Sequence, residues 1–443
     1  GKRNRLGNIE EFARLAEEGM KNLSKFSALE KDVEEAKQRF AEALLSRKIA
    51  EMPEEDEGPK ICPRCKKPAR LRKKNMPRTL LTVHGKQTIH RHGYYCERCR
   101  QGFYPRDVEL GLPEEGDMSL ELEERISDFV VNDPYDQAED RWQLHYRHCP
   151  LSSNAFRQVG KRLGEMTQET NPAILQGALR TPERSATKVL YVATDGSMVP
   201  MREGRWQEAK VGVLFREEHH SKGEKQHRGV ISEARYVATM ESQDKFREEM
   251  DVAVELEKGL KAEEVVWLGD GAPGNWTLAS QLCPEATQIL DWYHAVENGM
   301  KCGKALLSEA SPYLLLWKDT LERHLRCGNF LGLMRELEEC KKITKDENGL
   351  EAIDAIMRYY RNNRERIQYE VFRSKGYLIG SGVVESAHRH VIQCRMKRAG
   401  QHWSEKGADR MARLRAACQT AGPARFQRAI RWAHKASVEA QLK

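Results

Sequence analysis

The order of apolar and polar positions along the chain predicts helices in several separate segments. Apolar residues in 8–50 recur at helical spacing with Glu and Lys between them, which favours a helix pair for packing or dimerisation. Residues 293–375 show a helical pattern without any strand-like run, and helix is predicted again from Gly382 onward. Three more helices are predicted within residues 118–166, at about 119–130, 134–146 and 154–163.

A different pattern fills the middle of the chain. Short apolar runs predict five strands, at Val189–Ala193, Val211–Phe215, Tyr236–Met240, Val265–Leu268 and Gln288–Leu290. Helical patterns at about 242–259 and 275–282 separate the last three of them. This order predicts a mixed α/β sheet in a multidomain α/β protein. Linkers are predicted at residues 52–59 and 168–186, where Pro- and Gly-containing sequence interrupts the apolar pattern.

Four cysteines stand in two pairs that suit one metal ion. Cys62 and Cys65 form one CxxC pair, and Cys96 and Cys99 form a second pair after 30 intervening residues. Strand-like sequence at 79–95, with a turn at His84–Lys86, brings the pairs together. Two thiolates from each pair can bind one tetrahedral ion, which predicts a zinc ribbon. Four thiolates leave no open coordination position, so we expect this Zn²⁺ to be structural.

The net charge of the 443 residues is only +7, but the charged residues are distributed unevenly along the chain. Residues 60–106 carry 14 Lys/Arg and one acid, and residues 386–443 carry 13 Lys/Arg and three acids. Two basic segments on an acidic body favour nucleic acid as partner over a merely solvated surface. No apolar run approaches the ~18 residues of a membrane-spanning helix, so no membrane partner is expected.

The cysteine count and the first residues bear on the compartment. The chain has eleven cysteines, an odd number, and no apolar leader segment follows the basic start GKRNR. A disulfide framework is not expected in a chain of this kind. We therefore expect a reduced, cytoplasmic protein.

The helical segment at 118–166 is a candidate for DNA recognition. A break at Cys149–Ser153 precedes a helix that begins near Asn154. A short turn followed by such a helix suits a helix-turn-helix, and an ordinary helical bundle fits nearly as well. In the first case the DNA contacts would come from the basic residues of the helix, Arg157, Lys161 and Arg162.

Two of the predicted strands end in an aspartate beside a glycine, namely Asp195 and Asp270. Ligand sites gather at strand ends in α/β sheets, although an isolated Asp-Gly is also common in turns. Neighbouring carboxylates repel each other unless a cation lies between them, and Mg²⁺ or Mn²⁺ prefers such hard oxygen ligands. Two such ions, ~3.5–4 Å apart, catalyse phosphoryl transfer.

A second ion requires a third carboxylate. Glu385 is the preferred candidate, because Gly380 and Gly382 permit close backbone approach and Ser381 can cap the following helix. Glu297 is a weaker candidate, since it lies in ordinary helical sequence, and Glu309 is weaker for the same reason.

Asp291 and His294 stand at another strand–helix junction. They could orient a substrate phosphate, donate a proton, or simply cap the helix. Trp292 and Tyr293 between them could stack on bases, although packing in the core is the more common role of such residues.

Four strings of this sequence resemble those of bacterial insertion-sequence transposases of the ISKra type, which belong to the Mutator-like branch of the DDE transposases. The strings are ATDG at 193–196, LGDGA at 268–272, QILDWYHA at 288–295 and GSGVVES at 380–386. The resemblance covers roughly residues 60–420. It implies a ribonuclease-H-like catalytic fold with an α-helical insertion between the second Asp and the Glu.

Residue by residue, the resemblance implies that Asp195, Asp270 and Glu385 form the catalytic triad and hold two Mg²⁺ ions. Asp291 and His294 match an auxiliary motif of the family. The basic C-terminal helix of the family corresponds to further candidate DNA contacts, at Arg395, Lys397 and Arg398.

These patterns together predict a DNA transposase that cleaves phosphodiesters at element ends and joins the released 3′-OH to target DNA. We expect the partners to be terminal inverted repeats and target DNA, the protein to form a homodimer or higher oligomer, and its location to be the bacterial cytoplasm, with the nucleoid. A ribonuclease-H-like nuclease without strand transfer and a domesticated zinc-ribbon DNA-binding regulator remain alternatives.

The expected domain order follows from these assignments. It runs from an N-terminal helical segment (1–50) through the zinc ribbon (60–106), the helical DNA-binding segment (118–166), the first part of the catalytic core (187–294) and the helical insertion (295–375) to the C-terminal core helix and basic tail (376–443).

Overall fold

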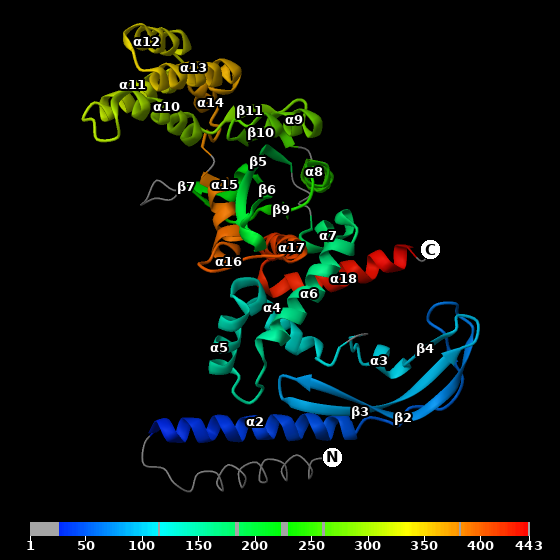
Figure 1. Ribbon diagram of the computed structural model, residues 1–443. Coiled ribbons are helices and arrows are strands. Elements are labelled where there is room, and N and C mark those ends of the chain that lie inside the picture. Colours follow the sequence, from blue (N-terminus) through cyan, green and yellow to red (C-terminus); the bar gives the residue numbers. More distant parts are fainter. Residues whose placement is uncertain are drawn as a thin grey trace. The chain divides into compact units, whose positions relative to one another are not determined.

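The computed structural model forms two compact units, one ending at Val159 and the other beginning at Gly160 (Figure 1). It describes residues 26–113, 116–181, 186–222, 229–258, 262–380 and 382–441. The part of the predicted N-terminal helix pair that precedes residue 26, and Ser381 with its predicted cap, lie outside the described residues. Among the helices of the described ranges, none combines the length and the apolar character that crossing a membrane requires.

The first unit is built on a long β-hairpin. One antiparallel sheet contains, in spatial order, β1 (Lys60–Ile61), β2 (Pro68–Thr82), β3 (Gly85–Cys96) and β4 (Gln101–Phe103). The predicted hairpin is confirmed, but β2 begins well before the apolar residues that predicted it. Basic residues fill its early exposed positions, while Ala69 and Leu71 between them face the interior. Helix α2 (Phe26–Ala50) packs on β3, where the Ser46 hydroxyl lies 2.8 Å from Gln87 Oε1.

The three helices predicted after the hairpin are confirmed, and the last of them continues past Val159 into the second unit. They are α4 (Leu120–Asn132), α5 (Tyr135–His145) and α6 (Ser153–Glu169), and a short α3 (Pro105–Glu109) precedes them. Ser119 caps α4 by accepting from Leu122 N at 3.3 Å, which explains where this helix begins. Trp142 is fully buried and donates its indole N–H to Cys149 O at 2.7 Å, which fixes the turn between α5 and α6.

The second unit is organised around a five-stranded mixed sheet. Its spatial order is β11–β10–β5–β6–β9, with β5, β10 and β11 parallel and β6 antiparallel to β5 and β9. The predicted succession of strands and helices is confirmed; a separate small hairpin of β7 and β8 was not predicted. The strands are β5 (Thr187–Pro200), β6 (Trp206–Arg216), β7 (His220–Lys222), β8 (Gly229–Ile231), β9 (Arg235–Thr239), β10 (Ala262–Gly269) and β11 (Thr287–Leu290).

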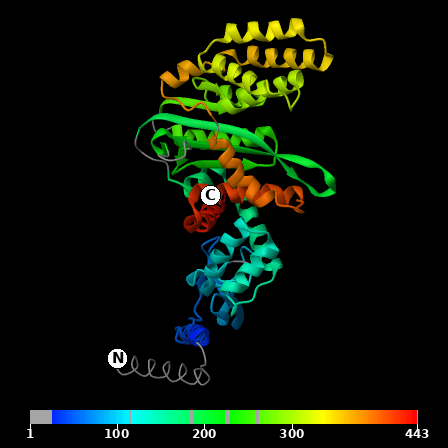
Figure 2. The same cartoon turned by 90° about the vertical axis from the view of Figure 1, so that its left-hand side faces the viewer.

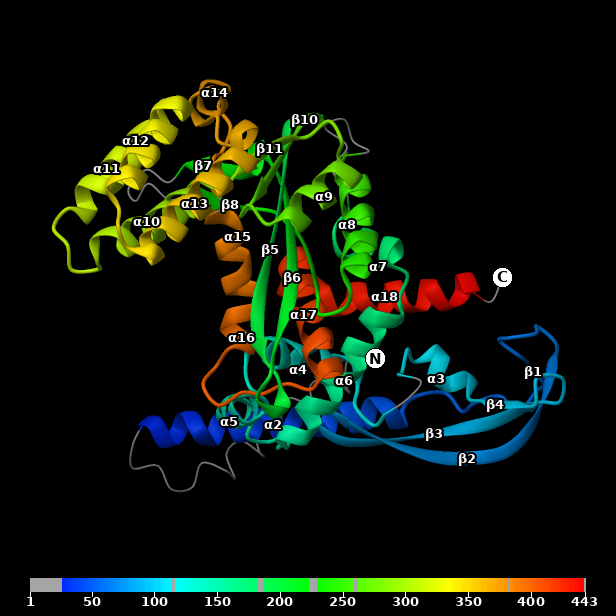
Figure 3. The same ribbon diagram turned by 45° about the horizontal axis from the view of Figure 1, so that its top comes forward.

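Helices lie on both faces of this sheet. Figure 3 shows α8 on one side of β5 and β6, and α15 on the other. The helices of the sheet are α8 (Gln243–Lys258), α9 (Pro273–Leu282), α15 (Gly382–Ala387), the π-helical η4 (His388–Gln393), α16 (Cys394–Met396), α17 (Glu405–Ala421) and α18 (Pro423–Gln441). α17 packs on β9, where buried Asp409 accepts from the Thr239 hydroxyl at 2.7 Å.

The predicted linker at 168–186 is partly wrong, because it contains helix α7 (Pro172–Leu179). Asn171 caps this helix by accepting from Ala173 N at 2.9 Å, and Pro172 occupies its first turn. A proline at this position needs no N–H partner, so it begins a helix as readily as it interrupts one. Buried Arg235 donates to Gln176 O at 2.7 Å, which ties α7 to the sheet.

The described residues between β11 and α15 form helices joined by loops, with no strand among them, as predicted for the insertion. Figure 2 shows it, in yellow to orange, as a helical layer beside the green sheet. Trp292 N donates to Ile379 O at 2.9 Å, so the chain leaves and re-enters the sheet domain at one place. The helices are α10 (Trp292–Leu307), α11 (Leu314–Arg326), α12 (Phe330–Ile343), α13 (Glu347–Asn362) and α14 (Tyr369–Ser374).

Candidate functional site

Three aspartates lie at equivalent positions of three neighbouring parallel strands. The ladder between β5 and β10 pairs Ala193 with Leu268, two residues before Asp195 and Asp270. The register of β10 and β11 places Asp291 opposite Asp270 in the same way. Because neighbouring strands lie ~4.8 Å apart, this register gathers the three residues at one edge of the sheet. We call them the aspartate row.

The structure corrects one detail of the prediction. Asp270 follows the last residue of β10, as predicted, but Asp195 lies inside β5 and pairs with Val211 of β6. The strand continues because Ser197 and Val199 alternate as buried positions beyond the apolar run. Pairing with β6 therefore extends β5 past the point at which its hydrophobic sequence ends.

Asn275 fixes the carboxylate of Asp270. Its Nδ2 donates to Asp270 Oδ1 at 2.8 Å, and the amide of Ala272 donates to the same oxygen at 2.9 Å. The Oδ1 of Asn275 accepts from the Thr194 hydroxyl at 3.2 Å, which links α9 to the strand that carries Asp195. Sequence reasoning missed Asn275. The available signal was its place in the first turn of the helix that directly follows Asp270.

The surroundings of Asp195 disfavour its charge. The side chain is 26% exposed, and burial raises the pKa of Asp195 to about 6, with a further contribution from the negative charge of Asp270. One hydrogen bond, from Gly196 N at 2.7 Å, opposes this shift. The carboxylate therefore lacks most of the compensation that a buried charge requires.

His388 lies beside Asp195, with Nε2 3.4 Å from Oδ2. Burial lowers the pKa of His388 to about 4, and the nearby charge of Lys397 adds to this effect. The imidazole is thus neutral at pH 7 and does not neutralise Asp195. His388 belongs to the π-helical segment η4, a geometry that is frequent at functional sites. Sequence reasoning did not single out this residue, because its contact with Asp195 depends on tertiary packing.

Asp291 and His294 act together at the start of α10. Asp291 is fully buried and caps the helix by accepting from His294 N at 2.9 Å. The imidazole Nδ1 of His294 lies 3.4 Å from Asp291 Oδ1, and this interaction raises the pKa of His294 against the effect of burial. The charges of Asp195 and Asp270 also raise it. The capping role is therefore confirmed, and it holds a half-exposed His294 close to the aspartate row.

Glu385 lies on α15, which packs against β5 and β6, and its side chain is exposed. It precedes His388 by three residues, so the two occupy neighbouring positions along one helix. Within the described residues, the carboxylates of Asp195, Asp270 and Glu385 are not all within 4.8 Å of one another. The rival candidate Glu297 is exposed and pairs with Lys301 at 3.2 Å. The catalytic triad stays a prediction.

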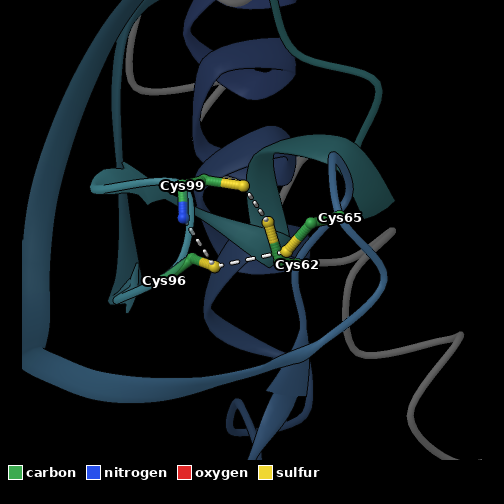
Figure 4. A group of neighbouring side chains, drawn as sticks. All are labelled: Cys62, Cys65, Cys96 and Cys99. Atoms are coloured by element: carbon green, nitrogen blue, oxygen red, sulfur yellow. Dashed lines mark hydrogen bonds between the residues drawn. The ribbon is translucent and has the colours of Figure 1, made fainter.

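The four cysteines of the predicted zinc site do converge. Their sulfur atoms all lie within 4.8 Å of one another, with Cys62 3.9 Å from Cys99 and Cys65 3.5 Å from Cys96 (Figure 4). The amide of Lys67 lowers the pKa of Cys65 to about 7, while the hydrogen bond that the Cys99 thiol donates to the Cys65 thiolate raises the pKa of Cys99 to about 12. Four thiolate-forming groups in this arrangement can hold a zinc ion.

The basic residues proposed to contact DNA from α6 differ in exposure. Arg157 and Lys161 are exposed; Arg157 lies 5.8 Å from the centre of the Tyr135 ring, and Lys161 lies 3.9 Å from Glu165. Arg162 is half-buried. Two of the three side chains are therefore available at the surface of this helix.

In the C-terminal segment, Arg395 does not lie at the surface where we expected it. Its side chain is 1% exposed and its guanidinium lies 5.1 Å from the centre of the Trp403 ring, so it packs inside the domain. Lys397 is exposed, and Asp195 is close enough to affect its pKa, which burial lowers overall. Arg398 is half-buried and donates to Cys394 O at 2.8 Å.

Comparison with known proteins identifies one family. The model of an uncharacterised protein family, UPF0236, matches residues 16–436. A UPF0236 protein of Caldanaerobacter subterraneus subsp. tengcongensis is 24% identical over 343 residues, which is 75% of this chain and 64% of that protein. A second from the same organism is 26% identical over 297 residues, or 65% of this chain and 55% of that protein. This chain therefore spans less than two thirds of either relative. Their names cover eleven and four gene loci, respectively.

A UPF0236 protein of Streptococcus gallolyticus is 24% identical over 322 residues, covering 71% of this chain and 66% of that protein. Among solved structures, the Drosophila P element transposase strand transfer complex matches 71% of this chain and 95% of that chain, with 11% identity and a TM-score of 0.29. A likeness this low carries no structural argument.

Proposed function

The chain belongs to the UPF0236 family, and we propose that it is a DNA transposase of the DDE type with a ribonuclease-H-like catalytic core. The observation that carries the proposal is the aspartate row. Asp195 and Asp270 stand side by side at one sheet edge, and the pKa of Asp195 is raised to about 6 by burial and by its neighbour. Carboxylates held in this way fit a divalent cation, whose charge would offset both effects.

In this proposal Asp195, Asp270 and Glu385 hold two Mg²⁺ or Mn²⁺ ions. Carboxylate oxygens are the ligands these ions prefer, and when bound the ions would supply activation of the attacking oxygen and stabilisation of the leaving oxygen. Asn275 keeps Asp270 in one orientation, because it holds Oδ1 and leaves Oδ2 outside its hydrogen bond. Glu385 would complete the ligand set from α15, where it precedes His388 by three residues.

His294 is the residue best suited to hold a proton near the reacting phosphate. Asp291 raises its pKa, so a larger fraction is protonated at neutral pH than for a free histidine. Its imidazolium would contact a phosphate oxygen or protonate the leaving oxygen. His388, neutral at the same pH, instead lies with its Nε2 3.4 Å from Asp195 Oδ2.

Three further observations support a transposase. The helical insertion separates Asp270 from Glu385, as the resemblance to ISKra-type enzymes implies. The names of two relatives cover eleven and four gene loci in one organism, a multiplicity that an element able to copy itself would leave. The two basic segments suit DNA, with terminal inverted repeats and target DNA as substrates in the bacterial nucleoid. Joining two element ends calls for a homodimer or higher oligomer.

The test uses the full chain, Mg²⁺ and labelled DNA taken from the sequence that flanks the gene. We expect cleavage that exposes a 3′-OH and joining of that end to a target duplex. Asp270→Asn and Glu385→Gln should each reduce the cleavage rate by about a thousandfold, since each removes a metal ligand. Glu297→Gln is the matched control and should cleave at the parental rate.

The same assay separates the alternatives. Cleavage without joining would favour a ribonuclease-H-like nuclease. Binding without cleavage in any divalent metal would favour a domesticated regulator. A Glu385→Gln variant with parental activity would remove Glu385 from the triad.

A further inference from the structure

The two cysteine knuckles are copies of one small hairpin. Residues 60–69 and 94–103 share a pattern in which a strand leads into C-x-R-C and a second strand follows. Their strand registers also correspond, because Ile61 pairs with Pro68 in the first copy and Tyr95 pairs with Gly102 in the second. The two close sulfur pairs each join the first cysteine of one knuckle to the second cysteine of the other. A local two-fold axis therefore relates the knuckles.

Cations occupy matching positions in the two copies. Arg64 and Arg98 precede the second cysteine, and Lys66 and Arg100 follow it. Lys66 and Arg100 both adopt left-handed backbone conformations, with φ of 57° and 52°. Glycine adopts this region without steric cost, so a long cationic side chain there is not explained by the fold. A cationic residue in a left-handed conformation at both symmetric positions points to a function for the charge.

All four side chains are exposed, and we call them the knuckle cations. Within the part of the chain that the structure describes, no ion pair joins any of them to a carboxylate. Glu97 is the only acid in residues 60–106. Because the four sulfurs lie within 4.8 Å of one another, the two loops lie side by side and present their charges together. The exposed positions of the adjoining β2 continue this basic surface, at Arg70, Arg72 and Lys73.

We propose that the knuckle cations form a clamp for the phosphates of duplex DNA. The choice of DNA rests on the proposed function; the clamp itself rests on the symmetry and the charges. The two strands of a duplex are antiparallel, so their phosphates are related by local two-fold axes. A two-fold arrangement of Arg64, Lys66, Arg98 and Arg100 can contact four phosphate groups, two on each strand, in an equivalent way. Such contacts position DNA without reading its sequence.

The test measures binding of the full, zinc-loaded chain to a labelled duplex of arbitrary sequence, without added Mg²⁺ or Mn²⁺, over a series of salt concentrations. The slope of log affinity against log salt reports the number of phosphate contacts, at about 0.9 for each contact. Replacing all four knuckle cations by Gln should make the salt dependence weaker, with the magnitude of the slope smaller by about 3 to 4. The charge-matched control replaces four exposed cations of the helical insertion, Arg335, Lys341, Lys342 and Lys345, and should leave the slope nearly unchanged.

A second variant separates binding from folding. Lys66→Gly and Arg100→Gly together remove two charges and place glycine where the backbone is left-handed. We expect the thermal midpoint to stay the same or rise while the slope falls by about 2. Parental binding by both this variant and the fourfold Gln variant would overturn the clamp. Tighter binding of an RNA duplex than of a DNA duplex would overturn the choice of DNA.

These outcomes are independent of catalysis. Asp270→Asn should bind with the parental slope, because it lies in the other unit and keeps every knuckle cation. If the clamp fails, flanking DNA is still cleaved by the parental chain whenever the proposed function is correct. If the proposed function fails, cleavage is absent while the salt dependence still depends on the knuckle cations.

Discussion

The cysteine knuckles and the aspartate row are both candidate metal sites, but their ligands are prepared to different degrees. In the knuckles, paired sulfurs lie 3.5 and 3.9 Å apart. Ligands of a tetrahedral zinc ion at ~2.3 Å lie about 3.8 Å from one another, so this arrangement already has the spacing of a bound site. Among the described residues, the carboxylates proposed as metal ligands, Asp195 and Asp270 of the row with Glu385, are not all within 4.8 Å of one another.

The chemistry of the ligands explains the difference. Thiols can share hydrogen bonds, as Cys65 and Cys96 do, and so approach one another before an ion arrives. Ionised carboxylates repel at the same distance, so strand register and Asn275 must hold them in place instead. A structural site can therefore be complete in advance, whereas a phosphoryl-transfer site completes itself when its cation and substrate arrive.

The largest expected effect would come from breaking the prepared site. Cys62→Ser with Cys96→Ser removes two of the four proposed zinc ligands, and we expect the first unit to lose about 5 kcal/mol or more of its free energy of unfolding, because structural zinc contributes roughly 10 kcal/mol. Zinc content and the thermal unfolding profile measure this. Cys327→Ser, an exposed cysteine of the second unit, is the control. Full zinc content and an unchanged profile in the double variant would contradict the assignment.

The next effect concerns how the aspartate row is held. Asn275→Ala removes the hydrogen bonds to Asp270 Oδ1 and to Thr194 without removing a proposed metal ligand. We expect DNA cleavage to fall about 10–100-fold, which is usual for residues that orient metal ligands. Part of the loss should be recovered at high Mg²⁺. Asn275→Asp should restore little, because a carboxylate cannot donate to Asp270. Parental cleavage at low Mg²⁺ by Asn275→Ala would remove its positioning role.

A smaller effect is expected on stability, from the charge of Asp195. The pKa of Asp195 is about 6 in the folded chain and ~3.9 when unfolded. The folded chain therefore binds this proton more tightly than the unfolded chain does, and the resulting contribution to the free energy of unfolding is fully present below pH ~4. That stability is lost as the pH rises through 6. At pH 7.5 without added Mg²⁺ or Mn²⁺, Asp195→Asn should therefore raise the free energy of unfolding by about 1–2 kcal/mol, out of an upper limit of ~3 kcal/mol. Urea unfolding at pH 7.5 and pH 4 measures this.

The gain should vanish at pH 4, and added Mg²⁺ should stabilise the parent but not the Asn variant. A loss of stability at pH 7.5 would show that the charge of Asp195 is compensated in the fold, contrary to its burial.

The smallest effect is expected from the hydrogen bond that Tyr359 of the helical insertion makes to the backbone of Asp270. Tyr359 donates its hydroxyl to Asp270 O at 3.1 Å, and its ring lies against Gly271, where φ is +96°. Tyr359→Phe keeps the ring and loses one hydrogen bond, so we expect a loss of about 1 kcal/mol and a small fall in cleavage rate. Tyr313→Phe, an exposed residue of the same insertion, is the control. Equal rates for the two variants would assign no role to this bond.

The sequence predicted much of the fold because apolar periodicity and chain punctuation are local. The helices α4, α5 and α6, and the succession of strands and helices along the second unit, follow from such signals. Prediction was wrong where one signal has two meanings, as at Pro172, which begins a helix within the expected linker. It was also wrong at Asp195, because pairing with β6 extends β5 beyond its apolar residues.

The candidate site was predictable only in part. The CxxC spacing predicted that the four cysteines cluster. The position of Asp195 and Asp270 beside glycines indicated that they are candidate site residues. His388 and Tyr359 were not visible, since their contacts join segments far apart in the sequence. Arg395 counted as a surface cation by its charge alone, whereas a nearby aromatic ring, Trp403, provides it with a buried position.

The hydrogen bond between Trp292 and Ile379 has a consequence for how this protein can change over evolutionary time. It closes the base of the helical insertion, so to the sheet domain the whole excursion is a loop whose ends are already joined. The entropy of such a loop depends only weakly on its length, so helices can be gained or lost there at little cost to the core. Descendants of this gene are free to vary in size at the insertion, provided that they keep the tyrosines that contact the ends of β10 and β11, Tyr359 and Tyr369.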